Sequence, residues 1–318
     1  MKALMYHYIR LGSEELPYFR YLHIEDFKAQ LDHLAENYKF ISKEEFLLSL
    51  KTKIPIENGV LLTFDDGLAD HYQVMKELVS RDLWGIFYIP TGCYESKTLI
   101  DVHRVHMLIG KFGGIKILDA LKEIVTEDMV SSDNELKFRD LTYSLQKNDK
   151  ATMQVKKILN YYINNDVKDK VLKELMDRFF ANEAELMNEY YLTEAQIKEM
   201  HGAGMIIGSH SVTHPVFSKL SYKEQFSEIH GSFSYIEKII GSFEIKTFCY
   251  PYGGDHVFTQ ETIDILTNEN SVFSFSVEQK EIDSIDLKNR RQALPRYDCN
   301  QFMYGKASMG NKRPEQFL

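Results

Sequence analysis

Cysteine is scarce in this chain, and long apolar segments are missing from it. The 318 residues include only Cys93, Cys249 and Cys299, an odd number with no C-x-x-C pair. A disulfide framework is therefore excluded and a reducing compartment is favoured. The first residues, MKALMYH, lack the apolar core of ~7–15 residues that a signal peptide requires. The longest apolar stretch, around residues 83–90, is too short to cross a bilayer. We expect a soluble, cytoplasmic protein without an integral membrane segment.

An excess of positive charge is also missing. The chain has 38 Lys and Arg against 47 Asp and Glu, a formal net charge of −9. A protein that binds the phosphate backbone of nucleic acids needs a basic face, and no basic run is present. With 44% apolar and 13% aromatic residues, the chain can bury a sizeable core, which excludes a disordered or fibrous protein. We expect no nucleic-acid partner.

Strand and helix patterns alternate in the first and last thirds of the chain. Residues 59–64 form a continuous apolar run that stops at two aspartates, as expected for a parallel strand buried on both faces. Three capping boxes, at Ser42, Thr193 and Ser221, each begin a predicted helix. The other strand candidates are residues 3–9, 84–90, 204–208, 247–250, 271–277 and 292–297. Such repeated β-then-α units predict an α/β fold with a parallel sheet or barrel.

The middle of the chain has a different composition. Residues 99–190 contain no clear strand pattern, no proline and many lysines, glutamates and leucines, which predicts a helical insertion. We therefore divide the chain into a first barrel part (residues 1–98), this insertion, a second barrel part (residues 191–298) and a C-terminal tail (residues 299–318). From Asn300 onward we assign no regular structure.

Two polar clusters follow predicted strands. Asp65 and Asp66 end the apolar run at 59–64, and two buried carboxylates are costly unless a cation or hydrogen-bond donors compensate them. Successive side chains on extended backbone point in different directions, so one aspartate can bind a metal while the other faces a substrate. His210 and His214 follow a second strand, and Pro215 disfavours a helix at His214. Two imidazoles and one carboxylate make a three-ligand site with positions left for water. Taken singly, each cluster has a plainer explanation: a helix N-cap after an Asp-Gly turn, and two unrelated histidines.

A third cluster, Tyr250-Pro251-Tyr252-Gly253-Gly254, follows another predicted strand. A turn of this composition can hold a backbone N–H in a fixed orientation, which suits an oxyanion hole. A tight turn after an edge strand explains the segment equally well. The three clusters occur in order, and each one ends an apolar strand. In α/β folds the functional groups gather at these carboxyl ends.

These motifs resemble a known family. Thr63-Phe64-Asp65-Asp66-Gly67 and His210-Ser211-Val212-Thr213-His214 match the first two motifs of the polysaccharide deacetylases, carbohydrate esterase family four, and the third cluster resembles another. The resemblance implies a distorted (β/α) barrel and one divalent metal. Zinc suits such ligands, and cobalt, nickel and iron fit nearly as well. Carried over by position, the resemblance implies that Asp66, His210 and His214 bind the metal and that Asp65 is the general base acting on the metal-bound water. It also implies that the backbone N–H of Tyr252 donates to the oxyanion. Substrate contacts are implied at Tyr250, Pro251 and Gly253.

The sequence departs from the family pattern in two places. The arginine expected two residues before Pro251, which contacts the catalytic base in the family, is replaced by Cys249. We take Arg296 as its candidate substitute, the alternative being an ordinary exposed arginine. The general acid is expected in a late motif that is not evident here. Met5-Tyr6-His7 instead resembles the N-terminal Tyr-His of the circularly permuted poly-N-acetylglucosamine deacetylases, which makes His7 the candidate acid. The alternative is a first-strand histidine satisfied in the core.

Two further histidines, His103 and His106, lie in the predicted insertion. On a helix that faces the catalytic part they would contact substrate. A purely structural role is the alternative. The purpose of the insertion itself stays open.

The expected function is metal-dependent removal of an N-acyl group, N-acetyl in the first instance, from an amino sugar in cell-surface polysaccharide or glycoconjugate biosynthesis. The missing signal peptide favours a nucleotide-linked, lipid-linked or small soluble sugar over an exported polymer. A sugar N-deformylase would need the same site with a smaller acyl pocket. Cys249 in place of the arginine supports a non-catalytic carbohydrate-binding relative. A non-haem Fe(II) oxygenase also uses two histidines and a carboxylate, but it has no use for Asp65 beside the ligand.

Overall fold

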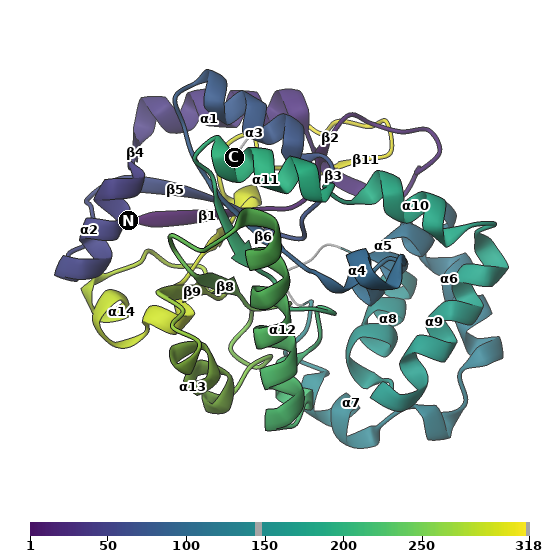
Figure 1. Cartoon of the computed structure of the whole chain (residues 1–318). Coiled ribbons are helices and arrows are strands. Elements are labelled where there is room, and N and C mark those ends of the chain that lie inside the picture. Colours follow the sequence, from purple (N-terminus) through teal and green to yellow (C-terminus); the bar gives the residue numbers. More distant parts are fainter. Residues whose placement is uncertain (144–147, 316–318) are drawn as a thin grey trace.

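Eight parallel strands form the centre of the protein. In the computed structural model, which describes residues 1–143 and 148–315, seven of them are hydrogen-bonded in the order β10-β1-β5-β6-β7-β8-β9, and β4 pairs with β5 (Figure 1). The strands are β1 (Lys2–Tyr6), β4 (Lys39–Phe40), β5 (Gly59–Phe64), β6 (Ile86–Ile89), β7 (Ile206–Ser209), β8 (Thr247–Cys249), β9 (Phe273–Phe275) and β10 (Tyr297–Asp298).

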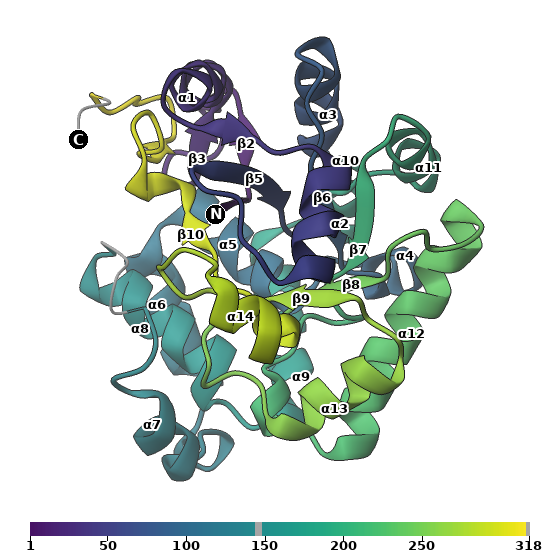
Figure 2. The ribbon, with the colours of Figure 1, turned by 90° about the vertical axis from the view of Figure 1, so that its left-hand side faces the viewer.

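The sheet curls into a barrel. Seen from the second direction, the strands follow one another around a curve from β10 to β9 (Figure 2). A parallel bridge between Phe275 and Leu294 links β9 to the segment that leads into β10. Every residue of β5 is buried, as the continuous apolar run predicts for a strand covered on both faces. The expected distorted (β/α) barrel is confirmed.

Helices cover the outside of the barrel. The capping boxes at Ser42, Thr193 and Ser221 are all formed, so each of these helices begins where the sequence predicts. The covering helices are α1 (Ile24–Asn37), α2 (Lys43–Thr52), α3 (His71–Ser80), α11 (Glu194–Gly202), α12 (Tyr222–Ile240), α13 (Gln260–Asn268) and α14 (Ser284–Asn289).

The chain between β6 and α11 forms a group of helices on one side of the barrel (Figure 1). One buried apolar cluster includes Leu108 and Leu172 from these helices together with Phe64 and Ile89 from the strands, so the two parts share a continuous core. The helices are α4 (Gly92–Ser96), α5 (Asp101–Phe112), α6 (Gly114–Ile124), α7 (Ser132–Phe138), α8 (Lys150–Lys157), α9 (Asn165–Phe179) and α10 (Glu183–Tyr190), with a π-helical turn η2 at Ile158–Tyr162 and a 3-10 turn η1 at Glu127–Met129.

Two expectations about the C-terminal part are wrong. The tail is ordered in part: β11 (Ser308–Met309) pairs antiparallel with β3 (Arg20–His23), which also pairs with β2 (Ile9–Arg10). The strand expected over residues 292–297 is instead a 3-10 turn, η4 (Arg291–Ala293), and only Tyr297 and Asp298 form a strand. Pro295 explains this difference, because it lacks an N–H and restricts the residue before it. Two further 3-10 turns are η3 (Phe217–Lys219) and η5 (Cys299–Gln301).

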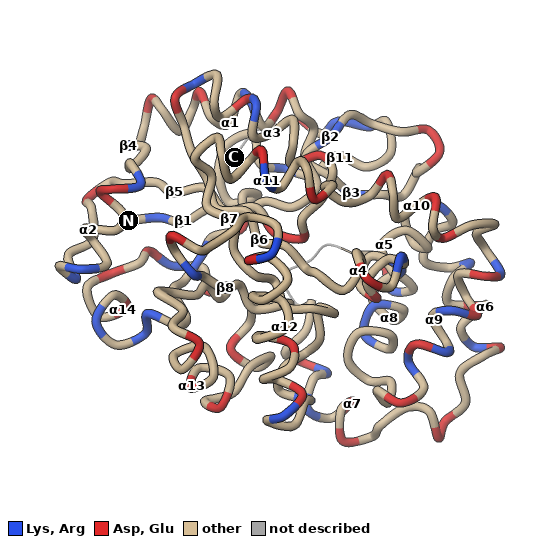
Figure 3. Tube along the Cα trace, viewed as in Figure 1, with Lys and Arg blue, Asp and Glu red and all other residues tan. Residues whose placement is uncertain are grey.

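The surface mixes charges of both signs. Lysine and arginine alternate with aspartate and glutamate along the helices in the view of Figure 3. Cys93, Cys249 and Cys299 are all free thiols. Within the described residues, no helix combines the length and the apolarity needed to cross a membrane.

Gly114 lets α6 approach α8, which gives a test of the packing in this group of helices. A Cβ atom on Gly114 would lie 2.7 Å from the Cα of Thr152. We expect Gly114→Ala to lower the free energy of unfolding by about 1–3 kcal/mol, because one helix must shift. The matched control is Gly202→Ala at the end of α11, where an added Cβ would have no described atom within 4 Å apart from its chain neighbours and its own helix backbone. It should leave stability unchanged or raise it by about 0.4–1 kcal/mol. Urea unfolding followed by circular dichroism measures both, and equal effects would contradict the packing argument.

Candidate metal centre and its surroundings

The predicted polar clusters lie at one end of the barrel. Asp65 and Asp66 follow β5, His210 follows β7, and Tyr252 lies in the turn after β8. His7 follows β1, the neighbour of β5. Because these strands are parallel, their carboxyl ends meet at the same edge of the barrel.

Three of these side chains converge on one point. The Asp66 Oδ1 atom lies 3.4 Å from His210 Nε2 and 3.7 Å from His214 Nε2. One donor atom from each of the three residues lies within 4.8 Å of the other two, and all three residues are buried. With bonds of 2.0–2.2 Å, ligands of a tetrahedral cation lie about 3.3 Å apart. The arrangement therefore has the dimensions of a three-ligand metal site.

The donor set also fits a divalent cation chemically. Within the part of the chain that the structure describes, Asp66 Oδ1 is a buried oxygen with no hydrogen-bond partner. Burial opposes ionisation of Asp66, but His103 and His210 together hold the pKa of this carboxyl well below its usual range. The site thus offers an ionised carboxylate and two imidazoles, the donors that suit zinc, cobalt, nickel or iron.

Hydrogen bonds orient the ring of His210 and the loop that carries both histidines. His210 Nδ1 lies 2.8 Å from the Cys249 carbonyl oxygen, so this nitrogen donates and Nε2 is the ring atom left to bind a cation. Glu228 of α12 accepts hydrogen bonds from the backbone N–H groups of Val212 and Thr213 at 2.9 and 2.8 Å. No sequence pattern indicated this role for Glu228, one of several glutamates in a predicted helix.

The loops that carry the site have unusual backbone conformations. Asp66, Ser211, His214 and Tyr252 have φ angles of 81°, 66°, 59° and 62°, in the left-handed region that non-glycine residues rarely adopt. Each such residue costs of the order of 1–3 kcal/mol and persists only when its surroundings hold it there. Four such residues therefore lie in the segments that orient the candidate ligands.

Arg296 holds Asp65 from inside the barrel. Its Nη1 and Nη2 atoms each lie 2.8 Å from one oxygen of Asp65, and Nη1 also donates to Thr63 Oγ1 at 2.9 Å. Arg296 is fully buried, which rules out an exposed arginine. Its Nη2 lies 2.9 Å from Cys249 Sγ, so the arginine reaches Asp65 beside the cysteine. Burial alone would raise the pKa of Asp65, but Arg296 outweighs it and lowers this pKa to about 2.

His7 lies near the same carboxylate. Its Nε2 atom lies 4.0 Å from Asp65 Oδ2, and its side chain is 39% exposed. Its backbone carbonyl accepts a hydrogen bond from His71 Nε2 at 2.9 Å. Burial lowers the pKa of His71 to about 4, so at neutral pH this ring is an uncharged donor. His7 is therefore not a core histidine whose hydrogen bonds are all satisfied inside the protein.

The residues at the turn after β8 have two different kinds of surroundings. Tyr252 packs against His214, with ring centroids 4.9 Å apart. Gly253 follows with a φ of 75°, and Pro251 is buried beside it. Tyr250 does not suit its expected role as a substrate contact. Its ring is buried and stacked on Phe258, and its hydroxyl donates to the Gln292 carbonyl at 2.6 Å.

The two insertion histidines, both on α5, have different surroundings. His103 is completely buried, and its Nε2 atom lies 3.1 Å from Asp66 Oδ2. Its Nδ1 atom lies 2.7 Å from the hydroxyl of Tyr191. His106 lies one turn further along, with Nδ1 2.8 Å from the hydroxyl of Tyr8. His103 therefore contacts a candidate metal ligand, whereas His106 contacts the chain that follows His7. No pattern in the sequence pointed to Tyr191.

Comparison with known proteins gives one family. A family model described as polysaccharide deacetylase matches residues 170–270, a range that contains His210, His214 and Tyr252 but not Asp65 or Asp66. No curated protein matches the chain. Several solved structures share the fold.

Three of these structures show the extent of the likeness. A Streptococcus pyogenes deacetylase, PplD, solved with acetate, is 19% identical, with 94% of this chain and 91% of that one covered and a TM-score of 0.56. A polysaccharide deacetylase from Bacillus cereus is 17% identical over 93% of this chain and 64% of that one, with a TM-score of 0.50. A de-N-acetylase from Aggregatibacter actinomycetemcomitans is 14% identical over 93% of both chains, also with a TM-score of 0.50.

The pairing of Asp65 with Arg296 can be tested through stability. Arg296→Met leaves a buried carboxylate without its partner, and we expect the free energy of unfolding to fall by about 3–5 kcal/mol. Combining it with Asp65→Asn removes both charges and should recover part of this loss. Urea unfolding of the metal-free proteins measures the difference. If the double variant is no more stable than Arg296→Met alone, the ion pair between Asp65 and Arg296 does not stabilise the protein as we expect.

Proposed function

We propose that this chain, whose residues 170–270 match the polysaccharide deacetylase family model, is a metal-dependent hydrolase that removes an N-acyl group, N-acetyl in the first instance, from an amino sugar. The observation that carries this proposal is the position of Asp65. It lies directly beside the Asp66, His210 and His214 cluster, and its carboxylate is held separately by Arg296. A metal site alone would need no second, independently oriented carboxylate.

Asp66, His210 and His214 are the residues that would hold the cation. When bound, a divalent cation supplies a Lewis acid for the acyl carbonyl oxygen and lowers the pKa of water toward ~7. The three protein ligands leave further coordination positions for water and substrate.

Asp65 is the proposed general base. Arg296 binds both of its oxygens, so the carboxylate is ionised at neutral pH and fixed in one orientation. It accepts a proton from the attacking water while the water oxygen bonds to the acyl carbon. The backbone N–H of Tyr252, in the turn after β8, is the proposed donor to the oxygen that gains negative charge.

His7 is the proposed general acid. Its exposed side chain can reach a substrate at the barrel end, and it lies close to Asp65. It gives a proton to the amine nitrogen as the C–N bond breaks, so that the products are a free amino sugar and a carboxylate. An uncharged His71 fixes the backbone of His7 through its carbonyl oxygen.

The position of Arg296 argues against a non-catalytic relative. That alternative rested on Cys249 in place of the family arginine. A buried arginine nevertheless contacts the proposed base, so the replacement at Cys249 does not leave Asp65 without a cationic partner.

The direct test is product release from N-acyl amino sugars, both free and in nucleotide- and lipid-linked form. We expect acetate release that chelation abolishes and zinc, cobalt or nickel restores. Asp65→Asn should lower kcat by about 10²–10⁴-fold while metal content stays at the wild-type level. The matched control is Asp119→Asn, at an exposed aspartate of α6, which should retain full activity.

Each other result has a defined meaning. Formate release in place of acetate would assign the chain as a deformylase with the same site. An unchanged rate in metal-loaded Asp65→Asn would overturn the base assignment. Metal binding without release from any substrate would contradict the hydrolase and favour a binding protein.

The assignment of His7 gives a separate prediction. We expect His7→Gln to lower the rate of amide hydrolysis by about 10²–10⁴-fold. It should affect an activated phenyl acetate ester much less, because a phenolate leaves without protonation. Asp65→Asn should impair both reactions, since each needs the attacking water to lose a proton. If His7→Gln slows ester and amide equally, His7 is not the general acid.

A further inference from the structure

We propose that His103, which the helical group between β6 and β7 supplies, is a positioning residue for Asp66, and that Tyr191 fixes the orientation of its ring. This inference rests on the proposed function in one respect, namely that Asp66 binds a metal. It assigns part of the metal centre to the helices outside the barrel.

The geometry of His103 suits this role. Its Nε2 atom lies 3.1 Å from Asp66 Oδ2, while Asp66 Oδ1 is the oxygen that faces His210 and His214. Within the described residues Nε2 is a buried nitrogen without a well-aligned hydrogen bond, so the short distance to the Asp66 carboxylate is the polar contact on which its role rests. One oxygen of the carboxylate is thus turned toward the other candidate ligands, and the second oxygen faces His103.

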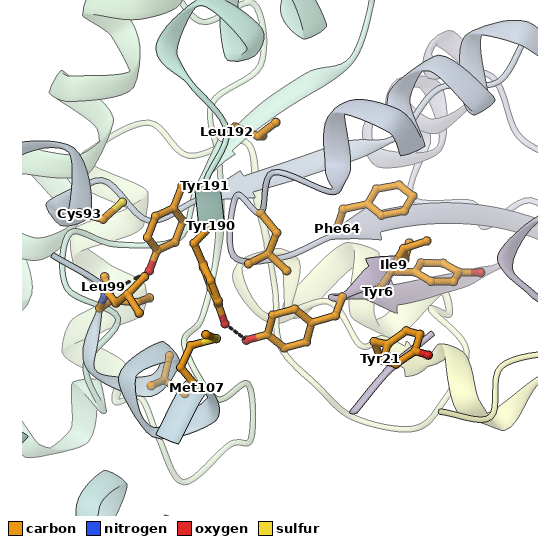
Figure 4. Packing of buried hydrophobic residues seen from close by; sticks show 14 of the residues in the cluster. Tyr6, Ile9, Tyr21, Phe64, Cys93, Leu99, Met107, Tyr190, Tyr191 and Leu192 are labelled. Carbon is orange, nitrogen blue, oxygen red and sulfur yellow. Dashed lines mark hydrogen bonds between the residues drawn. The ribbon is translucent and has the colours of Figure 1, made fainter. Parts of the chain in front are cut away.

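The hydrogen bonds around Tyr191 fix which ring nitrogen carries the proton. The backbone N–H of Ile100 donates to the Tyr191 hydroxyl oxygen at 3.1 Å (Figure 4). The hydroxyl can then donate its own hydrogen to His103 Nδ1, 2.7 Å away. With Nδ1 as an acceptor, a neutral imidazole carries its proton on Nε2, the atom that faces the Asp66 carboxylate. A proton there makes the contact attractive, whereas a lone pair would repel the carboxylate.

Tyr191 is itself anchored to the loop that carries Asp66. Leu68 forms an antiparallel bridge with Tyr191, and the backbone N–H of Leu192 donates to the Gly67 carbonyl at 2.9 Å. Ile100 stands directly before α5, which carries His103, while Tyr191 directly follows α10. Both ends of the helical group therefore meet at the aspartate loop, and the contacts close a ring from Asp66 through His103 and Tyr191 back to Leu68.

Residues that orient a metal ligand through a hydrogen bond typically contribute 10–100-fold to metal affinity. His103 would contribute by preventing rotation of the Asp66 carboxylate and by satisfying its second oxygen. A histidine that merely fills the core would contribute to stability and leave metal affinity unchanged. The two roles therefore predict different results in a binding experiment.

The experiment measures zinc affinity of the full chain by competition with a chromophoric chelator. We expect His103→Phe to raise the zinc Kd by about 10–100-fold. His103→Gln can place an amide N–H near the position of Nε2, so it should restore a large part of the affinity. An unchanged Kd in a folded His103→Phe protein would overturn the proposal. So would equal losses in the two variants, because packing rather than the donor would then decide the affinity.

Tyr191→Phe provides a second test that leaves His103 in place, should His103→Phe fail to fold. It removes only the hydroxyl that binds Nδ1, and the zinc Kd should rise by a smaller factor than in His103→Phe. The matched control is Tyr190→Phe, the neighbouring buried tyrosine, whose hydroxyl bonds to that of Tyr8 instead (Figure 4). Its zinc Kd should equal that of the wild type. Equal Kd values for the two tyrosine variants would overturn the role of Tyr191.

Cobalt spectroscopy separates positioning from direct ligation. At saturating Co²⁺, His103→Gln should keep the visible absorption envelope of the wild type, because the ligand set is unchanged. A new envelope would show that His103 is itself a ligand and would overturn the positioning role. All these readouts are independent of catalysis. Failure of wild-type protein to bind metal would refute the proposed function, whereas normal binding by the variants would refute only this inference.

Discussion

The buried pair between Arg296 and Asp65 is the interaction on which the rest of the site depends. A guanidinium in the interior of a barrel is tolerated only when a carboxylate and further acceptors surround it. Here both Asp65 oxygens, Thr63 Oγ1 and the Ser276 carbonyl receive its hydrogen bonds. These contacts join β5 to the segments after β9 and before β10, where the barrel closes. The same contacts fix the proposed base, so closure of the fold and orientation of the site are one event.

Much of this arrangement could be predicted from sequence because the decisive signals are local. The apolar run of β5, the paired aspartates and the spaced histidines each lie within a few consecutive residues. Arg296 was found because the family arginine was missing at Cys249. Its contacts with Asp65 could not be derived, because they depend on how the barrel closes between distant segments.

The failures have physical reasons as well. Successive side chains of an extended segment point to opposite sides: Cys249 faces Asp65, so Tyr250 faces the core beneath α13 rather than a substrate. The two-residue strand β11 is too short to produce a periodic pattern. The link between His103 and Tyr191 joins residues 88 positions apart, and neither has a sequence signature.

The distance along the chain between Asp65 and Arg296, 231 residues, has a consequence for how the protein folds during its synthesis. The aspartate leaves the ribosome long before the arginine, and until then no guanidinium is present to compensate a buried carboxylate. Closing the early strands around an ionised Asp65 without that cation is costly, because a buried charge would be left unpaired. The barrel therefore completes only after residue 296 has emerged, and until then the apolar strands need other contacts, or chaperones, to keep them from aggregating.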